Sequence, residues 1–437
     1  MRSIRNYWTK RFVSLLFATA FVPAALLAVP NPAPDAIEAG AINPKEAKAQ
    51  LSRGLEQFTK GDYAGAEKYF NESIRLDSSQ VEVRLLLAEI RLRQGRLDDA
   101  EALVRKAMSI KPNSPNMLVA LGNVLLLKKD SARAEEMYRK ALAINKNHVP
   151  AHLGLGELYL KLLNRPQEAI AAYGRAVEIN PDLLSARLAL GSAYAATGQI
   201  DKAIAAFQVA TKLAPTDPQA LHAIGRLQTG QKKLDQAVSS FSAALTANAF
   251  YMPALIDRAD VLFELGRDLE AAADYGSAVA RAGNNAQLWL KLGLVNDRLQ
   301  RKSEAIKAYQ KAVSINSSLS LAYNNMAWLV MDEKDRLDQA LEWSTKATSL
   351  APANPQFHDT LGWIYRARGE LVPARKSLET ATQLTPPQAD VFYHLGIVLQ
   401  EQGQKKEAED AFKRSLQIDK RFRDAPDAER RLGELSK

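Results

Sequence analysis

The chain has 437 residues, of which 47% are hydrophobic and 24% charged, and it contains no cysteine, which excludes disulfide bonds, a thiolate nucleophile and cysteine-type zinc sites. Its formal net charge is +9, but residues 1–28 contribute four basic groups and no acid, so the remainder holds 54 basic and 49 acidic residues, a net +5. Because the two signs alternate along the chain and form no basic stripe, the charge argues against a nucleic-acid binder.

The N-terminus has the pattern of a secretory signal. Residues 1–11 are polar and basic, and residues 12–30 are uncharged and mostly apolar. A cleaved signal peptide within residues 1–28 is one interpretation, and an uncleaved membrane anchor is the second, because nineteen residues are just long enough to span a bilayer. A fortuitous apolar stretch is the third. The first two both predict export of the body, behind a Pro/Ala-rich linker at residues 29–44.

From Ala47 onward the chain repeats itself every 34 residues. Counted from the start of each repeat, position eight is always glycine or alanine, position twenty is always alanine, and position twenty-four is mostly aromatic. Gly54, Ala66 and Phe70 hold these places in the first repeat. Two helices approach closely only where their side chains are small, so the pattern predicts eleven helical hairpins in residues 45–422.

Glycine within the repeats and proline between them indicate where the helices end. Proline stops a helix because it lacks the backbone donor, and glycine accepts the left-handed conformation that follows many helices. The fourth and ninth repeats each hold one extra residue in the inner turn, at residues 162–166 and 331–338. Residues 423–437 continue as a polar-faced helix, which we expect to cap the array.

This ladder of small residues resembles the tetratricopeptide repeat family over residues 47–422. The resemblance implies an all-α fold, a right-handed α-solenoid of about eleven helix-turn-helix hairpins with a C-terminal capping helix. It also implies that the first helices line a concave groove through positions two, five, nine, twelve and thirteen. The fold by itself implies only binding, so the function has to be argued from the side chains at these positions.

The groove positions become aromatic in the last three repeats. Trp328 and Trp363 hold position nine in neighbouring repeats, and we expect Tyr393 to reach the same surface one repeat later. One interpretation is an aromatic strip that anchors a peptide helix or stacks on sugar rings; the other is that each tryptophan packs between hairpins and shows only an edge. The predicted partner-binding residues are Asn324, Trp328, Asp332, Asp359, Trp363, Arg366 and Tyr393.

A narrower resemblance covers roughly the last hundred residues. The segments 324–329, 359–363 and 393–396 are similar to tetratricopeptide proteins of bacterial exopolysaccharide assembly and export. With the leader, this implies a periplasmic or inner-membrane-anchored scaffold that binds envelope or export proteins, with the membrane reached only through residues 12–30. The alternative is direct exopolysaccharide binding by the Trp/Tyr strip.

The residues offer no catalytic site. The sequence contains no GxSxG, HExxH or Walker-type motif. His148 and His152 have the spacing of a helical metal pair, but Pro150 lies between them and no third ligand is close in the sequence. We therefore predict a protein that is not an enzyme and that has no cofactor and no metal site.

Overall fold

The computed structural model describes residues 43–435, and all regular structure in this range is helical. The predicted leader and nearly all of the predicted linker lie outside these residues. Between residues 43 and 435 no helix combines the length and the apolar character needed to cross a bilayer. The chain divides into two compact units, residues 1–227 and 228–437, and the boundary falls inside helix α12 (Pro218–Gly230).

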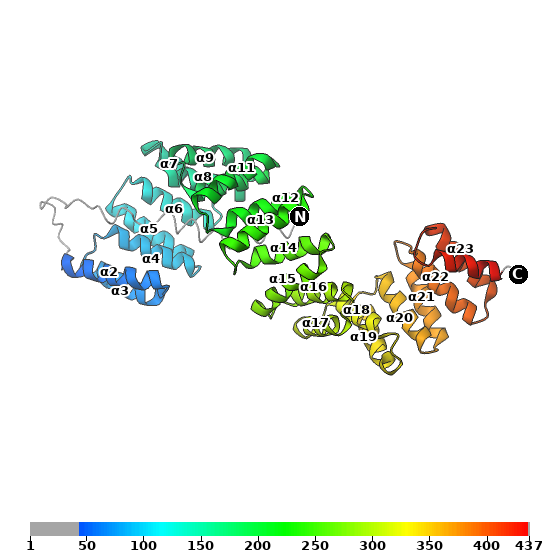
Figure 1. Cartoon of the computed structure of the whole chain (residues 1–437). Helices are drawn as coiled ribbons and strands as arrows, with labels where there is room; N and C mark the ends of the chain where they lie inside the picture. The colour runs from blue at the N-terminus through cyan, green and yellow to red at the C-terminus, as the bar shows by residue number, and fades with distance from the viewer. Residues whose placement is uncertain (1–42, 436–437) are drawn as a thin grey trace. The chain divides into compact units, whose positions relative to one another are not determined.

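Unit 1 is a stack of helical hairpins, coloured blue to green in Figure 1. Each first helix packs against the second helix of its own hairpin, and each second helix up to α9 packs against the next first helix. Most of α12 follows at the end of the unit. The hairpin helices of unit 1 are α2 (Pro44–Lys60), α3 (Tyr63–Leu76), α4 (Val81–Arg93), α5 (Leu97–Ile110), α6 (Pro115–Leu127), α7 (Ser131–Ile144), α8 (Val149–Lys161), α9 (Pro166–Ile179), α10 (Leu184–Ala196) and α11 (Ile200–Leu213).

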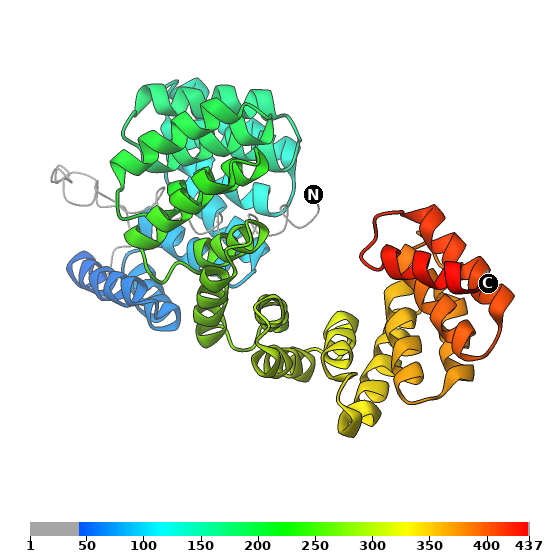
Figure 2. The same cartoon turned by 45° about the vertical axis from the view of Figure 1, so that its right-hand side comes forward.

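Unit 2 continues the same pattern from α13 to α23, with a single helix, α24, packed on α23 (Figure 2). The predicted all-α class and the solenoid-like hairpin arrangement are thus confirmed within each unit. The helices of unit 2 are α13 (Leu234–Ala247), α14 (Met252–Glu264), α15 (Asp268–Arg281), α16 (Ala286–Arg298), α17 (Lys302–Ile315), α18 (Ser320–Val330), the 3₁₀ turn η2 (Lys334–Arg336), α19 (Leu337–Leu350), α20 (Pro355–Ala367), α21 (Leu371–Gln383), α22 (Ala389–Glu401), α23 (Lys405–Ile418) and α24 (Ala425–Leu435).

Glycine at position eight makes room for a ring from the facing helix. A Cβ added at Gly293 would lie 2.4 Å from Cδ1 of Tyr309, and one at Gly396 would lie 2.6 Å from Cε1 of Phe412. Such separations are far inside van der Waals contact, so any larger residue forces the ring or the helix to move. The close approach expected from the sequence therefore depends mainly on the ring at position twenty-four. These rings are buried: Phe70, Tyr138, Tyr173, Phe207, Tyr309 and Phe412.

The glycines in the inner turns have a left-handed backbone, as predicted. All six have φ between 74° and 81°, a region that costs residues with a Cβ about 1–2 kcal/mol. The six are Gly61, Gly95, Gly198, Gly266, Gly369 and Gly403. Four other hairpins make the same turn with Lys129, Asn164, Lys232 or Gln300 at φ between 53° and 63°. In the ninth hairpin the extra residue is accommodated in a loop that contains the 3₁₀ turn η2.

Candidate partner-binding surface

The predicted surface is carried by the first helices α18, α20 and α22 of unit 2. Neighbouring first helices contact each other directly, α18 with α20 and α20 with α22. Positions five and nine lie one helical turn apart on each helix and therefore share a face. The arrangement brings the predicted residues onto one part of unit 2, and their exposure decides what each of them contributes.

Trp328 is the accessible aromatic group of this surface. Its side chain is 43% exposed, and it is the one exposed tryptophan among residues 43–435. No cation or second ring within those residues packs on it at the distances seen for Trp363. An indole left this open in a folded chain offers a large apolar face to a partner.

Trp363 instead packs within unit 2. Its ring stacks on His394 of α22 with 4.1 Å between centroids, and the Arg366 guanidinium lies 4.5 Å above it. The side chain also packs against two of the buried apolar clusters of the unit. The two tryptophans therefore differ: Trp363 fits the interpretation of packing between hairpins, and Trp328 fits that of an exposed anchor.

Tyr393 does not reach the surface, contrary to our expectation. Its side chain is only 7% exposed and packs against Phe412 and Phe422. Its hydroxyl donates a 2.7 Å hydrogen bond to Asp427 of α24. Burial and the nearby Asp427 carboxylate raise the pKa of Tyr393 to about 12. The helix that follows α23 covers this side chain, so of the three rings of the predicted strip only Trp328 is exposed.

Asn324 and Asp359 hold position five and are both buried. Asp359 Oδ1 lies 2.8 Å from His394 Nδ1, in a hydrogen bond that joins α20 to α22. Asn324 differs, because its Oδ1 is covered and has no hydrogen-bond partner in the described residues. Leaving such an acceptor unpaired costs about 1–3 kcal/mol. Asp332, one turn beyond Trp328, is exposed and makes no ion pair within residues 43–435.

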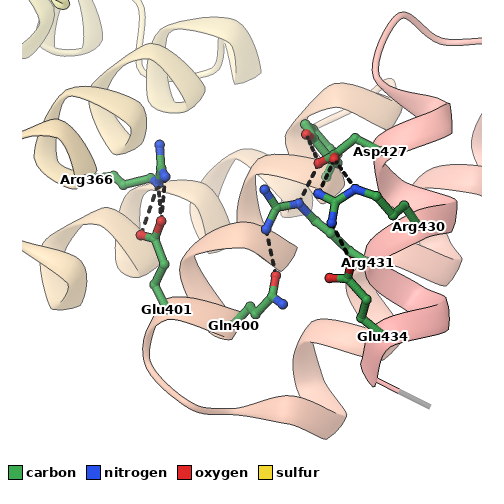
Figure 3. Close-up of polar contacts among 8 residues, drawn as sticks. Arg366, Gln400, Glu401, Asp427, Arg430, Arg431 and Glu434 are labelled. Carbon is green, nitrogen blue, oxygen red and sulfur yellow. Dashed lines mark hydrogen bonds and ion pairs between the residues drawn. The ribbon is translucent and has the colours of Figure 1, made fainter. Parts of the chain in front are cut away.

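Arg366 and the C-terminal end of α22 are tied together by polar contacts (Figure 3). The guanidinium of Arg366 forms an ion pair with Glu401 of α22 through both carboxylate oxygens. Next to it, Gln400 accepts a 2.8 Å hydrogen bond from Arg431 of α24. The guanidinium of Arg366 thus contacts the Trp363 ring and pairs with the Glu401 carboxylate. Arg366 therefore links two neighbouring hairpins.

Sequence reasoning missed the contribution of α24. Asp427 accepts hydrogen bonds from Arg430 and Arg431 of its own helix (Figure 3). It also accepts one from Tyr393, and this contact joins α24 to α22. The signal was available, because the 34-residue period places Asp427 at position five and Arg431 at position nine of a twelfth first helix. Position eight of that helix is Arg430 instead of glycine or alanine. The predicted cap is therefore also a continuation of the repeat surface.

The equivalent line in unit 1 is polar but internally paired. Glu89, Asn123 and Glu157 hold position nine of α4, α6 and α8, and all three are buried. Asn123 accepts a 2.8 Å hydrogen bond from Tyr138, and Glu157 pairs with Lys161 on its own helix. Burial raises the pKa of the Glu157 carboxyl, although the nearby Lys161 opposes this shift. Because these side chains are buried, they leave little for a partner to contact.

The histidines near the suspected metal spacing take other roles. His148 Nε2 lies 2.8 Å from Asn116 Oδ1, and His152 Nε2 lies 2.9 Å from the carbonyl oxygen of Lys146. In residues 43–435 no three histidine, aspartate or glutamate side chains converge as metal ligands would. Nothing in this geometry favours ligation by the pair.

The fold defines a helical-repeat protein, of a class that generally binds protein partners and is generally non-catalytic. Models described as tetratricopeptide repeat match residues 57–122, 162–227, 222–286, 256–319 and 389–422, and one described as TPR repeat matches residues 362–403. Together they cover more than half of the chain. The protein belongs to the tetratricopeptide repeat family, and proteins of this family generally serve as scaffolds for protein–protein interaction.

Individual relatives share the repeats and little else. Protein O-mannosyl-transferase TMTC3 of Homo sapiens is 23% identical over 324 residues, covering 74% of this chain and 30% of the relative. Cellulose synthase operon protein C of Xanthomonas axonopodis pv. citri is 31% identical over 166 residues, covering 38% of this chain and 10% of the relative. The chain thus spans less than a third of the length of either. Among solved structures, the hetero-tetramer Cut9–Hcn1 of APC/C matches 90% of this chain and 97% of its own at 15% identity and a TM-score of 0.43.

Proposed function

We propose that this protein is a non-catalytic scaffold of the bacterial cell envelope that binds partner proteins through the first-helix face of its last repeats. The observation that carries the proposal is Trp328, an indole 43% exposed on a helix face where Trp363 and Tyr393 are packed. Exposed aromatic anchors of this kind often supply much of the binding energy at protein interfaces.

The envelope assignment is supported by the sequence. A basic segment followed by an apolar one opens the chain, and two of its three interpretations, a cleaved signal peptide and an uncleaved anchor, export the repeats. The similarity to cellulose synthase operon protein C supports a place in polysaccharide export, with protein export as the alternative. Fractionation of cells that express the full-length chain tests this: we expect it in the periplasm or in the inner membrane facing the periplasm, and recovery in the cytosol would refute the assignment.

Partner binding is tested by crosslinking in the native host, followed by affinity capture and mass spectrometry. We expect Trp328→Ala to reduce the capture of specific partners without changing stability, because its side chain is exposed. Leu269→Ala is the matched control, since Leu269 is also exposed but lies on the second helix α15. Equal capture by the wild type and the Trp328 variant would rule out this surface.

Direct binding of an exopolysaccharide is the second candidate. It is favoured by the open face of Trp328, because indole rings stack on sugar rings, and by the neighbouring Asp332, which is placed to accept hydrogen bonds from hydroxyl groups. Calorimetry with purified secreted polymer separates the two candidates: heat that disappears in Trp328→Ala supports a carbohydrate site, and the absence of heat supports the protein scaffold.

A further inference from the structure

One face at the end of α18 presents hydrogen-bond acceptors and an open ring. Asn324 and Trp328 lie four residues apart on the same side of α18, and Asp332 follows four residues later in the turn past the end of the helix. The backbone stays helical at Met331, one residue past the end of α18. These residues offer the unpaired Oδ1 of Asn324, the exposed indole of Trp328 and the exposed carboxylate of Asp332, with no donor to pair them.

A second carboxylate without an ion pair is carried by α16, the first helix of the hairpin before α18. Asp297 of α16 is half-buried and forms no ion pair within residues 43–435, and burial raises its pKa. Burial and, to a smaller extent, the charge of Asp297 also raise the pKa of Tyr309. The Tyr309 hydroxyl accepts a 3.1 Å hydrogen bond from Asn325 of α18. Tyr309 is therefore hydrogen-bonded to α18, the helix that carries Trp328, and lies within reach of the Asp297 charge.

Three other carboxylates of unit 2 are paired within the chain. Asp260 pairs with Lys291, Glu333 with Lys302 and Arg336, and Glu401 with Arg366. Lys334 and Asp335 in the turn after Asp332 are both exposed and cancel in charge. The unpaired charge around Trp328 is therefore negative, from Asp297 and Asp332.

The neighbouring hairpin contains an internal version of the missing contact. At Trp363, the chain's own Arg366 lies over the ring with Glu401 as its counter-ion. Arg366 stands at position twelve, three residues after Trp363; the residue three places after Trp328 is Met331, which has no charge and is buried. The ring of Trp328 thus lacks the cation that covers the ring of Trp363. A carboxylate, that of Asp332, follows Trp328 four residues later.

We propose that the surface formed by Asp297, Asn324, Trp328 and Asp332 binds a basic, amphipathic peptide segment of a partner protein. A lysine or arginine of the partner lies over the Trp328 indole and is neutralised by Asp332 and Asp297, as Arg366 lies over Trp363. Apolar residues of the partner cover the rest of the indole. Asn324 Oδ1 is covered in the free protein, so a partner donor reaches it only after a neighbouring side chain moves. An acidic segment would meet two unpaired carboxylates and is disfavoured. This inference rests on the proposed scaffold function.

The test measures binding of fluorescent synthetic peptides to the full-length chain. Three peptides share one helical leucine pattern and differ only in their remaining positions, which are lysine, glutamate or glutamine; cellohexaose serves as a carbohydrate probe. We expect the lysine peptide to bind most tightly and to weaken as salt is added. Trp328→Leu keeps apolar area but removes the indole, and should weaken binding about two- to five-fold, the value of an exposed cation–π contact.

Charge variants separate a specific contact from general attraction. Asp332→Asn should weaken the lysine peptide by up to about five-fold, while Asp335→Asn, with the same change in net charge, should leave it unchanged. Equal affinity for the lysine and glutamate peptides, or equal effects of the two variants, would overturn the inference and leave the scaffold proposal standing. Trp328-dependent binding of cellohexaose with no peptide preference would overturn it in favour of a carbohydrate site. If no peptide binds, the inference fails, and capture from crosslinked cells then decides the scaffold proposal separately.

Discussion

Gly396 of α22 faces the fully buried ring of Phe412 from α23, and its replacement by alanine should destabilise the last hairpin. The new Cβ would lie 2.6, 2.7 and 3.0 Å from three ring carbons. Overpacking of this kind costs about 1–3 kcal/mol. Alanine in a helix interior regains about 1 kcal/mol over glycine, because it loses less backbone entropy on folding. We therefore expect Gly396→Ala to lower the free energy of unfolding by up to about 2 kcal/mol.

The sign should reverse once the ring is removed. In Phe412→Val the space is open, so adding Gly396→Ala should raise stability by about 1 kcal/mol relative to Phe412→Val alone. The chain already holds this combination in its second hairpin, where Ala88 at position eight accompanies Val104 at position twenty-four. Gly276→Ala in α15 is the control for helix propensity, because a Cβ there meets no atom within 4 Å.

Long repeat arrays do not always unfold in a single step, so a local measurement is needed beside the global one. Urea unfolding followed by circular dichroism gives the overall change, and hydrogen exchange read from α22 and α23 gives the stability of the last hairpin. We expect faster exchange in Gly396→Ala and slower exchange in Gly276→Ala near its own site. If Gly396→Ala stabilises the wild-type background as much as it stabilises Phe412→Val, the argument from ring contact is wrong.

Three further outcomes follow from the contacts in the structure. Trp363→Ala should cost roughly 3 kcal/mol in urea unfolding because its ring is packed, whereas Trp328→Ala should change stability by less than about 0.5 kcal/mol; equal losses would contradict the assigned exposures. Burial opposes ionisation of Asp427, but hydrogen bonds from Arg431, Tyr393 and Arg430 outweigh it and hold its pKa below the ordinary range. A carboxyl group with a depressed pKa stabilises the fold above its unfolded pKa of about 3.9, and this stabilisation is lost as the pH falls. The protection of α24 amides against exchange should therefore decrease below about pH 4 in the wild type. In Asp427→Asn this protection should depend less on pH. The pKa of Glu157 is raised by burial, so its ionisation opposes folding as the pH rises above the unfolded value; Glu157→Gln should raise the urea midpoint at pH 7, and a lower midpoint would show that its pairing with Lys161 outweighs its burial.

Much of the fold follows from local pattern. Each hairpin is specified by residues within 34 positions of one another, since small residues at positions eight and twenty and the left-handed turn glycines act between neighbours in the chain. Gly396 and Gly403 are readable in this way without coordinates. The twelfth first helix was equally readable from the period, which places Asp427 at position five. The polar composition of this helix by itself indicates only a cap.

The role of each side chain on the candidate surface needed the tertiary structure. Trp328 and Trp363 occupy the same repeat position, so the period of the sequence alone does not tell their roles apart. They differ because His394 and Arg366 cover one ring, and no described side chain covers the other in the same way. Tyr393 is withdrawn from the surface by α24, which begins more than thirty residues later in the chain. The sequence alone determined which residues belong to the first-helix face, because that depends on period; which of them stay exposed depended on contacts from the next repeat, which only the packed structure decides.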